Sequence, residues 1–304
     1  MGGNRNAIAY GILKSAKVNT KGMSPKQAWQ KVKELGLLGK AKSYGYNDDE
    51  LDALFDEINN FHPTPEMESV IEKAKGVAKK VTVTTNAHEN FEKAIDRLLA
   101  LKEQYGFEML EEIKTVDWVG PNPASVSKDG KTLMISNRFL ENPKIVIDND
   151  IKVLTGISQD YQNSKSDFNE LLNNKCEDVK LLNEAQSEYL ENARKSAFGR
   201  CHVGINDVTK SDDILKTVIT HETGHILSAR FSKDKKEKLV KEFQRLMSQY
   251  KAIENPQERA LIHSVSLRAT ERAPEFFSEL FVMFNTSDEM PEELHRIVTE
   301  ALYA

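Results

Sequence analysis

The chain has 304 residues, of which 39% are hydrophobic and 29% are charged, a balance typical of a globular protein with a sizeable buried core. Its 42 basic and 47 acidic side chains give a formal net charge of −5. A mildly acidic chain offers no electrostatic reason to bind nucleic acid or an anionic membrane surface, so we expect neither partner.

The expected location follows from features that the sequence lacks. No stretch approaches the roughly 20 apolar residues of a membrane-spanning helix, and the first residues contain no apolar segment of the signal-peptide kind. Two cysteines, Cys176 and Cys201, are too few for a disulfide-framed secreted domain. We expect a cytoplasmic protein with two free thiols; one bridge between them is the alternative.

Apolar periodicity predicts four helices in the first third of the chain. The dipeptide Thr64-Pro65 has the cap and first-turn proline that open a helix, and Gly106 is suited to end one. The helices are expected over residues 25–35, 51–58, 65–74 and 89–105.

The pattern then changes to short β-prone segments. Residues 115–119 and 131–136 are separated by glycine, proline and asparagine turn residues, which predicts a small sheet. The polar segment 159–199 is expected to be a loop with one helix, over about 178–195. Further helices are expected over residues 212–230, 234–252, 274–284 and 291–303.

This order of elements predicts a mostly helical α+β fold with a small sheet. Residues 1–84 contain only short helices and polar turns, so we expect a helical N-terminal region there. Residues 85–304 are expected to form a second domain, in which the sheet lies beside a helical half.

The motif HETGH, residues 221–225, lies within the apolar helical pattern of residues 212–230. Residues four apart share a helix face, so the two imidazoles can bind one cation, and zinc readily accepts two histidine nitrogens. Glu222 is placed to take a proton from an attacking water molecule. The alternative is a surface helix with two solvated histidines, but unpaired His and Glu among apolar residues would be costly to bury.

A catalytic zinc needs a third protein ligand. Glu275 and Glu279 lie four residues apart in a phenylalanine-rich helical segment, and two buried carboxylates on one face would repel each other without a cation. We predict that Glu275 binds the metal and that Glu279 accepts the outer N–H of a ligand histidine. The alternative is that one carboxylate pairs with Arg272 or Lys251 at the surface.

These motifs resemble a known family. HETGH, followed 50 positions after its second histidine by the glutamate of PEFFSELF, is similar to the gluzincin metallopeptidases related to the catalytic domain of anthrax lethal factor. The similarity covers roughly residues 88–304. It implies a zincin-like fold with His221, His225 and Glu275 as ligands of Zn²⁺, Glu222 as general base and Glu279 beside His221.

The same resemblance implies a substrate-binding edge strand at Leu133, Ile135 and Asn137, along which an extended peptide would pair by backbone hydrogen bonds.

One position departs from the family pattern. The family often carries an oxyanion-stabilising tyrosine seven residues before the glutamate ligand, and this chain has Arg268 there. An arginine can stabilise negative charge but cannot donate a phenolic proton. Arg268 is therefore the expected second catalytic residue, and His263 or Tyr250 could take its place.

We therefore expect a zinc-dependent endopeptidase that acts on a peptide or protein. The missing tyrosine favours an alternative, a structural or phage virion-associated protein with a degenerate, non-catalytic zinc site. A third interpretation is an interaction module that binds a partner through residues 1–84. Similar domains occur in phage head-morphogenesis proteins and bacterial toxins, which implies a phage capsid or toxin-delivery partner, and virion association or delivery into a target cell.

Overall fold

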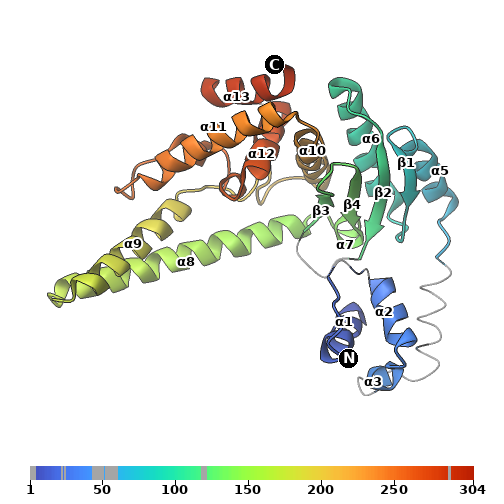
Figure 1. The fold of residues 1–304 in the computed structure, drawn as a ribbon, viewed down its shortest axis with the longest axis horizontal. Helices are drawn as coiled ribbons and strands as arrows, with labels where there is room; N and C mark the ends of the chain where they lie inside the picture. Colours follow the sequence, from blue (N-terminus) through green and yellow to red (C-terminus); the bar gives the residue numbers. More distant parts are fainter. Residues whose placement is uncertain are drawn as a thin grey trace.

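The computed structural model describes residues 5–21, 23, 25–42, 51, 61–117, 122–286 and 289–304. Helices dominate, and the strands form one small sheet, so the predicted mostly helical α+β fold is confirmed (Figure 1). The predicted helix over residues 51–58, apart from Leu51, and the predicted strand end at Val119 lie outside the described residues.

The N-terminal helices bury a small core of their own. Trp29 lies at the centre of this core and is fully buried. This N-terminal core is formed by side chains of α1 (Arg5–Ser15), α2 (Pro25–Glu34) and α3 (Leu38–Lys42), together with Leu51.

A second, larger core runs from Met67 to Val298. Helix α5 (Pro65–Ala74) and strand β1 (Ala78–Thr82) contribute to this core and its sheet, although both lie upstream of residue 84. The expected boundary at residues 84–85 therefore does not separate the two cores. They divide between Leu51 and Met67, because β1 pairs with the rest of the sheet.

Local capping rules explain two of the helix ends. The Thr64 side chain accepts a hydrogen bond from the N–H of Met67 at the start of α5. Helix α6 (His88–Tyr105) ends at Gly106, whose φ of 65° is the left-handed conformation that glycine adopts without strain. Both ends were predicted from the sequence.

The sheet has four strands in the order β1-β2-β4-β3. Strands β2 (Leu110–Val116) and β4 (Thr132–Ser136) correspond to the two predicted strands, although β2 begins five residues earlier than expected. Strand β1 pairs parallel with β2, β2 pairs parallel with β4, and β3 (Ala124–Val126) runs antiparallel to β4. Strand β3 therefore forms one edge of the sheet and β4 is an interior strand.

Helix α7 (Asn137–Glu141) follows β4 directly, and two longer helices then form an arm that projects from the body of the molecule (Figure 1). The arm consists of α8 (Ile145–Asn173) and α9 (Val179–Ser196). The rings of Tyr161 and Phe168 on α8 stack on Tyr189 of α9, with centroids 5.9 and 5.7 Å apart.

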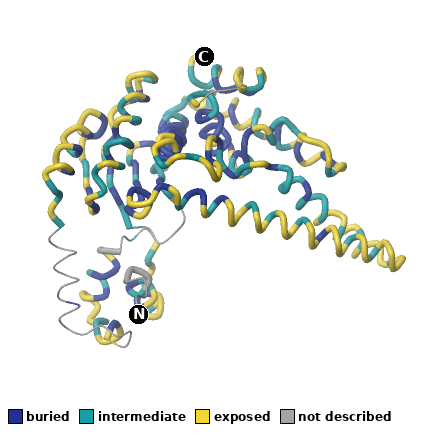
Figure 2. Tube along the Cα trace, turned by 180° about the vertical axis from the view of Figure 1, so that it is seen from behind, coloured by how far each residue is buried: buried dark blue, intermediate teal, exposed yellow. Residues whose placement is uncertain are grey.

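The sequence predicted only α9 in this region, and the expected loop is instead the long helix α8. Most of α8 is exposed, as Figure 2 shows along the arm, and its buried residues are few and partly polar. A helix with so little buried surface carries only a weak apolar period, so periodicity could not reveal it.

The remaining helices build the body around the candidate site. These are α10 (Ser211–Ala229), α11 (Lys233–Lys251), α12 (Ala273–Thr286) and α13 (Glu292–Tyr303), with two short 3₁₀ turns, η1 (Leu261–Ser264) and η2 (Arg268–Thr270). All four α-helices were predicted within a few residues. Cys176 and Cys201 are free thiols, as expected.

Candidate metal centre

The HETGH motif lies in the second half of α10, a helix buried on most of its faces. Asp212 and Asp213 occupy its first turn, where carboxylates complement the helix dipole. A helix covered on most sides must satisfy its polar side chains within the protein. For His221 and His225 the partners come mainly from α12.

Gly224 allows α10 and α12 to approach closely. A Cβ atom at this position would lie 2.8 Å from Cα of Ser278 and 2.9 Å from its Oγ. Neither distance is compatible with a normal packed contact, so α12 could not sit as close to any other residue. The glycine between the two histidines thus brings Glu275 and Glu279 within reach of the imidazoles.

Three side-chain atoms from the two helices converge on one point. Nε2 of His221 lies 3.1 Å from Nε2 of His225 and 3.1 Å from Oε2 of Glu275, and His225 Nε2 lies 3.3 Å from the same oxygen. These three residues are also the one group of histidine, cysteine and acidic side chains in the described part of the chain with the spacing of a metal site.

The triangle has the dimensions that zinc requires. Ligand atoms at 2.0–2.1 Å from a tetrahedral zinc lie roughly 3.3 Å from one another. The three separations of 3.1–3.3 Å match this value, and two imidazoles with one carboxylate are a common catalytic zinc set. The residues present therefore fit a zinc ion, which His221, His225 and Glu275 would hold.

Glu279 contacts His221 on the side of the imidazole ring opposite the three converging atoms. Its Oε1 lies 2.7 Å from Nδ1 of His221, and its Oε2 accepts hydrogen bonds from the N–H of Val203 at 2.7 Å and the hydroxyl of Ser266 at 2.8 Å. Burial lowers the pKa of His221, but Glu275 and Glu279 outweigh it and raise this pKa to about 10. Nδ1 of His221 thus lies at ion-pair distance from Glu279, while Nε2 lies beside Glu275 and is the atom available to a cation.

Two arginines contact the Glu275 carboxylate at different oxygens. Nη2 and Nε of Arg272 donate to Oε1 at 2.6 and 3.2 Å, and Nε of Arg268 donates to Oε2 at 3.2 Å. Nη1 of Arg268 also binds Glu271 at 2.9 Å. Burial raises the pKa of Glu275, but hydrogen bonds from both histidines hold it well below its usual range. Pairing of Glu275 with Arg272 was expected as an alternative to metal binding. The structure contains this ion pair together with the contacts of Glu275 to both histidines.

Glu222 is buried beside the cluster and keeps one oxygen free. Only 6% of the residue is exposed, and no group among the described residues donates a hydrogen bond to its Oε2. Burial raises its pKa, although the neighbouring histidines oppose this. A buried carboxylate oxygen without a partner is costly unless a water molecule or ligand binds to it, and a raised pKa suits a group that takes up a proton.

The cluster opens into a cavity of about 590 Å³. The edge strand β3 and the turn after it form one wall, and residues of α8, α10, α11 and the start of α12 form the others. Gly130 lets this turn lie against α10, because a Cβ there would be 2.8 Å from that of Ala229.

The expected substrate-binding residues do not lie in this cavity. Leu133 and Ile135 on β4 are fully buried, and neither they nor Asn137 line the cavity. Asn137 is also buried, and its amide donates to the carbonyl oxygen of Thr84 and to Oδ1 of Asp117. The expectation that these residues form an edge strand was wrong, because β3 covers the outer side of β4. The exposed edge belongs to β3. This strand was not predicted, because its three residues carry only a weak β pattern.

Tyr250 and His263 lie elsewhere as well. Their rings pack together with Phe198, at centroid distances of 4.6–6.0 Å, and none of the three lines the cavity. His263 accepts a hydrogen bond from the N–H of Ala260 and contacts the carbonyl oxygen of Arg194. Arg268, in contrast, lines the cavity beside Glu275.

A further histidine lies in the cavity wall, and its pairing with Asp150 was not predicted from the sequence. Nδ1 of His202 lies 3.0 Å from both carboxylate oxygens of Asp150 on α8, and its ring centroid is 6.3 Å from that of His221. Burial lowers the pKa of His202, but Asp150 and Glu279 outweigh this and raise it. The two partners are 52 positions apart in the chain, so no local pattern could have paired them.

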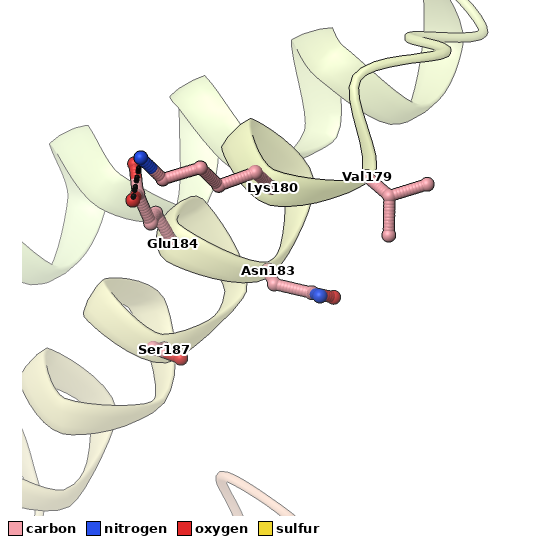
Figure 3. Close-up of a pocket in the computed structure, with 5 residues that line it drawn as sticks. All are labelled: Val179, Lys180, Asn183, Glu184 and Ser187. Atoms are coloured by element: carbon pink, nitrogen blue, oxygen red, sulfur yellow. Dashed lines mark ion pairs between the residues drawn. The ribbon is translucent and has the colours of Figure 1, made fainter.

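A hollow on α9 carries no comparable arrangement. Figure 3 shows that its lining comes from about two turns of this one helix, with Lys180 and Glu184 as an ion pair at 3.8 Å. Both of these side chains are largely exposed, so the pair contributes little.

Comparison with known proteins adds no family to this picture. No protein-family model, no curated protein and no solved structure matches the chain. Within the described ranges, no helix combines the length and apolar character that crossing a membrane requires.

Proposed function

We propose that this protein is a zinc-dependent endopeptidase. The observation that carries the proposal is the triangle of His221, His225 and Glu275, with ligand atoms 3.1–3.3 Å apart beside the unpartnered buried carboxylate of Glu222. The motif resemblance found in the sequence points to the same activity.

Bound zinc would supply the Lewis acidity that brings the pKa of water to roughly 7 and polarises a peptide carbonyl. Glu222 takes the proton from the attacking water molecule and delivers it to the leaving amine. Its free Oε2 and its raised pKa suit both steps.

Arg268 is the candidate for stabilising the negative charge that develops on the carbonyl oxygen. Its guanidinium lines the cavity and is anchored by Glu271 and Glu275, so its position is held before substrate binds. A charged donor fixed in a partly buried site stabilises a developing oxyanion effectively.

The substrate is proposed to bind as an extended peptide along β3. Ala124, Ser125 and Val126 line the cavity, and among the described residues β3 pairs only with β4, on one side. The other edge can add a peptide strand through backbone hydrogen bonds, which recognise the main chain of many sequences.

The test combines a metal assay with a peptide library. We expect the purified protein to bind one zinc ion per chain and to cleave some library members. Glu222→Gln should bind zinc as tightly as the wild type and cleave none of them. Cleavage retained by Glu222→Gln would refute the proposed general base, and a wild-type protein that binds no zinc would refute the metal centre.

The second candidate is a structural or virion-associated protein whose zinc site is not catalytic. Two arginines already balance the charge of Glu275, and Arg268 occupies the position where the resembling family has a tyrosine. Zinc binding without cleavage of any library member would favour this candidate. A phage capsid or a toxin-delivery system is the partner that we propose for either function.

A further inference from the structure

The charged side chains that line the cavity are sorted by sign. The acidic ones, Asp150, Glu222, Glu275 and Glu279, are all buried, with exposed fractions of 8%, 6%, 1% and 1%. Three of them are already paired with a histidine: Asp150 with His202, Glu275 with both metal-site histidines and Glu279 with His221. The interior is therefore acidic, and three of these four carboxylates contact a histidine.

The basic side chains of the lining have the opposite placement. Lys128, Lys236 and Arg272 are exposed, and the Arg268 side chain is one-third exposed. We call these four residues the basic rim. Every solvent-exposed charge that lines the cavity is thus positive, although the chain as a whole has a net charge of −5.

The rim cations come from three places around the opening. Lys128 lies in the turn after the edge strand β3, Lys236 on α11, and the two arginines just before α12. In the described part of the chain, Lys128 has no ion-pair partner. Its neighbour Asp129 is turned to the Ser127 hydroxyl at 2.6 Å and to the N–H of Lys131 at 3.2 Å.

The other rim cations differ in how far their charge is balanced. Lys236 donates to the carbonyl oxygen of Ala229, a neutral acceptor that leaves its charge unbalanced. Arg268 and Arg272 share the carboxylate of Glu275, and Glu271 is the one further acidic partner. Two guanidinium groups face two carboxylates there, and one of these carboxylates is also a proposed zinc ligand.

From this distribution we infer that the cavity selects peptides with acidic side chains flanking the bond to be cleaved. The inference rests on the proposed function and names its substrate class. A peptide lying along β3 would extend past Lys128, two residues beyond the strand, within the cavity that Lys236, Arg268 and Arg272 also line. Like-signed charges along a cleft raise the local concentration of oppositely charged ligands and speed their association.

Three synthetic peptides test the inference. They share one apolar centre and are flanked by glutamates, glutamines or lysines. Zinc-loaded wild-type protein should cleave the acidic peptide with a kcat/KM about tenfold above that of the basic one. The ratio should fall towards one at 1 M salt, where the Debye length shrinks to about 3 Å.

Variants on two exposed lysines locate the effect. Lys128→Gln should reduce the acidic preference and Lys128→Glu should abolish or invert it, because the first removes one rim charge and the second reverses it. Lys238→Glu is the matched control: Lys238 is also exposed, lies two positions from Lys236 on α11, and does not line the cavity. It should leave the preference unchanged.

Binding measured without turnover separates this inference from the proposed function. Peptide affinity is measured by calorimetry with zinc-loaded Glu222→Gln, and the acidic peptide should again bind most tightly. Cleavage with equal rates for the three peptides, or with the basic one fastest, would overturn the inference and leave the peptidase intact. Selective binding of the acidic peptide, with no cleavage by the wild type, would overturn the peptidase and leave the basic rim.

Discussion

Oε1 of Glu279 lies 2.7 Å from Nδ1 of His221. Glu279 follows the proposed ligand Glu275 by one turn of α12. The carboxylate thereby determines which imidazole nitrogen faces the cavity. Because the same side chain also accepts from the N–H of Val203 and the hydroxyl of Ser266, its own position is fixed by three contacts. Helix α12 thus supplies both the proposed ligand Glu275 and the carboxylate that contacts His221, while α10 supplies the two histidines.

Glu279→Gln should weaken zinc binding about 10- to 100-fold, because the neutral amide holds the imidazole less firmly and makes it a poorer ligand. The measurement is a competition titration with a chelator of known affinity. Glu258→Gln, on an exposed residue outside the cavity, serves as the control. An unchanged zinc affinity in Glu279→Gln would contradict the supporting role.

Gly224→Ala should both destabilise the protein and lower its zinc affinity. The added Cβ meets the backbone of α12 at 2.8 Å, so the two helices must separate, at a cost of about 1–3 kcal/mol. Gly156→Ala on α8 is the control, since its added methyl group would meet nothing within 4 Å and alanine favours a helix. The measurement is the free energy of unfolding of both variants by chemical denaturation. Equal values for the two variants would argue against the close approach of α10 and α12 at Gly224.

His202→Ala should lower the free energy of unfolding by about 1–3 kcal/mol, because it leaves the buried Asp150 carboxylate without its hydrogen-bond partner. Asp150→Asn tests the same contact from the other side. If the two groups interact directly, the double variant should lose less stability than the sum of the single losses. Additive losses would mean that the contact contributes nothing.

His263 should contribute a loss of stability in mild acid, whereas the raised pKa of His202 contributes in the opposite direction. Burial lowers the pKa of His263, and protonating its Nδ1 would also remove the hydrogen bond from the N–H of Ala260. At His263 the unfolded chain, with a histidine pKa of about 6.5, therefore binds more protons than the folded one, so this contribution to stability is complete above that pH and decreases below it.

Unfolding of the wild type and His263→Gln between pH 5 and pH 8 checks this expectation. The variant should be less stable than the wild type at pH 8, and this difference in stability should shrink towards pH 5. Its peptidase activity should survive, because His263 lies outside the cavity. Parallel curves for the two proteins would show that His263 does not titrate as proposed.

The sequence by itself determined the features that depend on local order. The spacing within HETGH and the apolar residues around it predicted α10, and the phenylalanine-rich segment with its two glutamates predicted α12. Thr64 and Gly106 marked helix ends through their own hydrogen bonds and backbone conformation. Each of these signals lies within a few residues, where helical geometry fixes which side chains share a face.

Only the tertiary structure decided which distant segments meet. Strand β3, not β4, forms the open edge, because long-range pairing sets the order of strands and three residues carry almost no β signal. The pairing of His202 with Asp150 depends on how the arm joins the body. The same is true of the basic rim, whose members come from a turn and two helix regions. Contacts between segments far apart in the chain leave no period in the sequence, so folding alone brings them together.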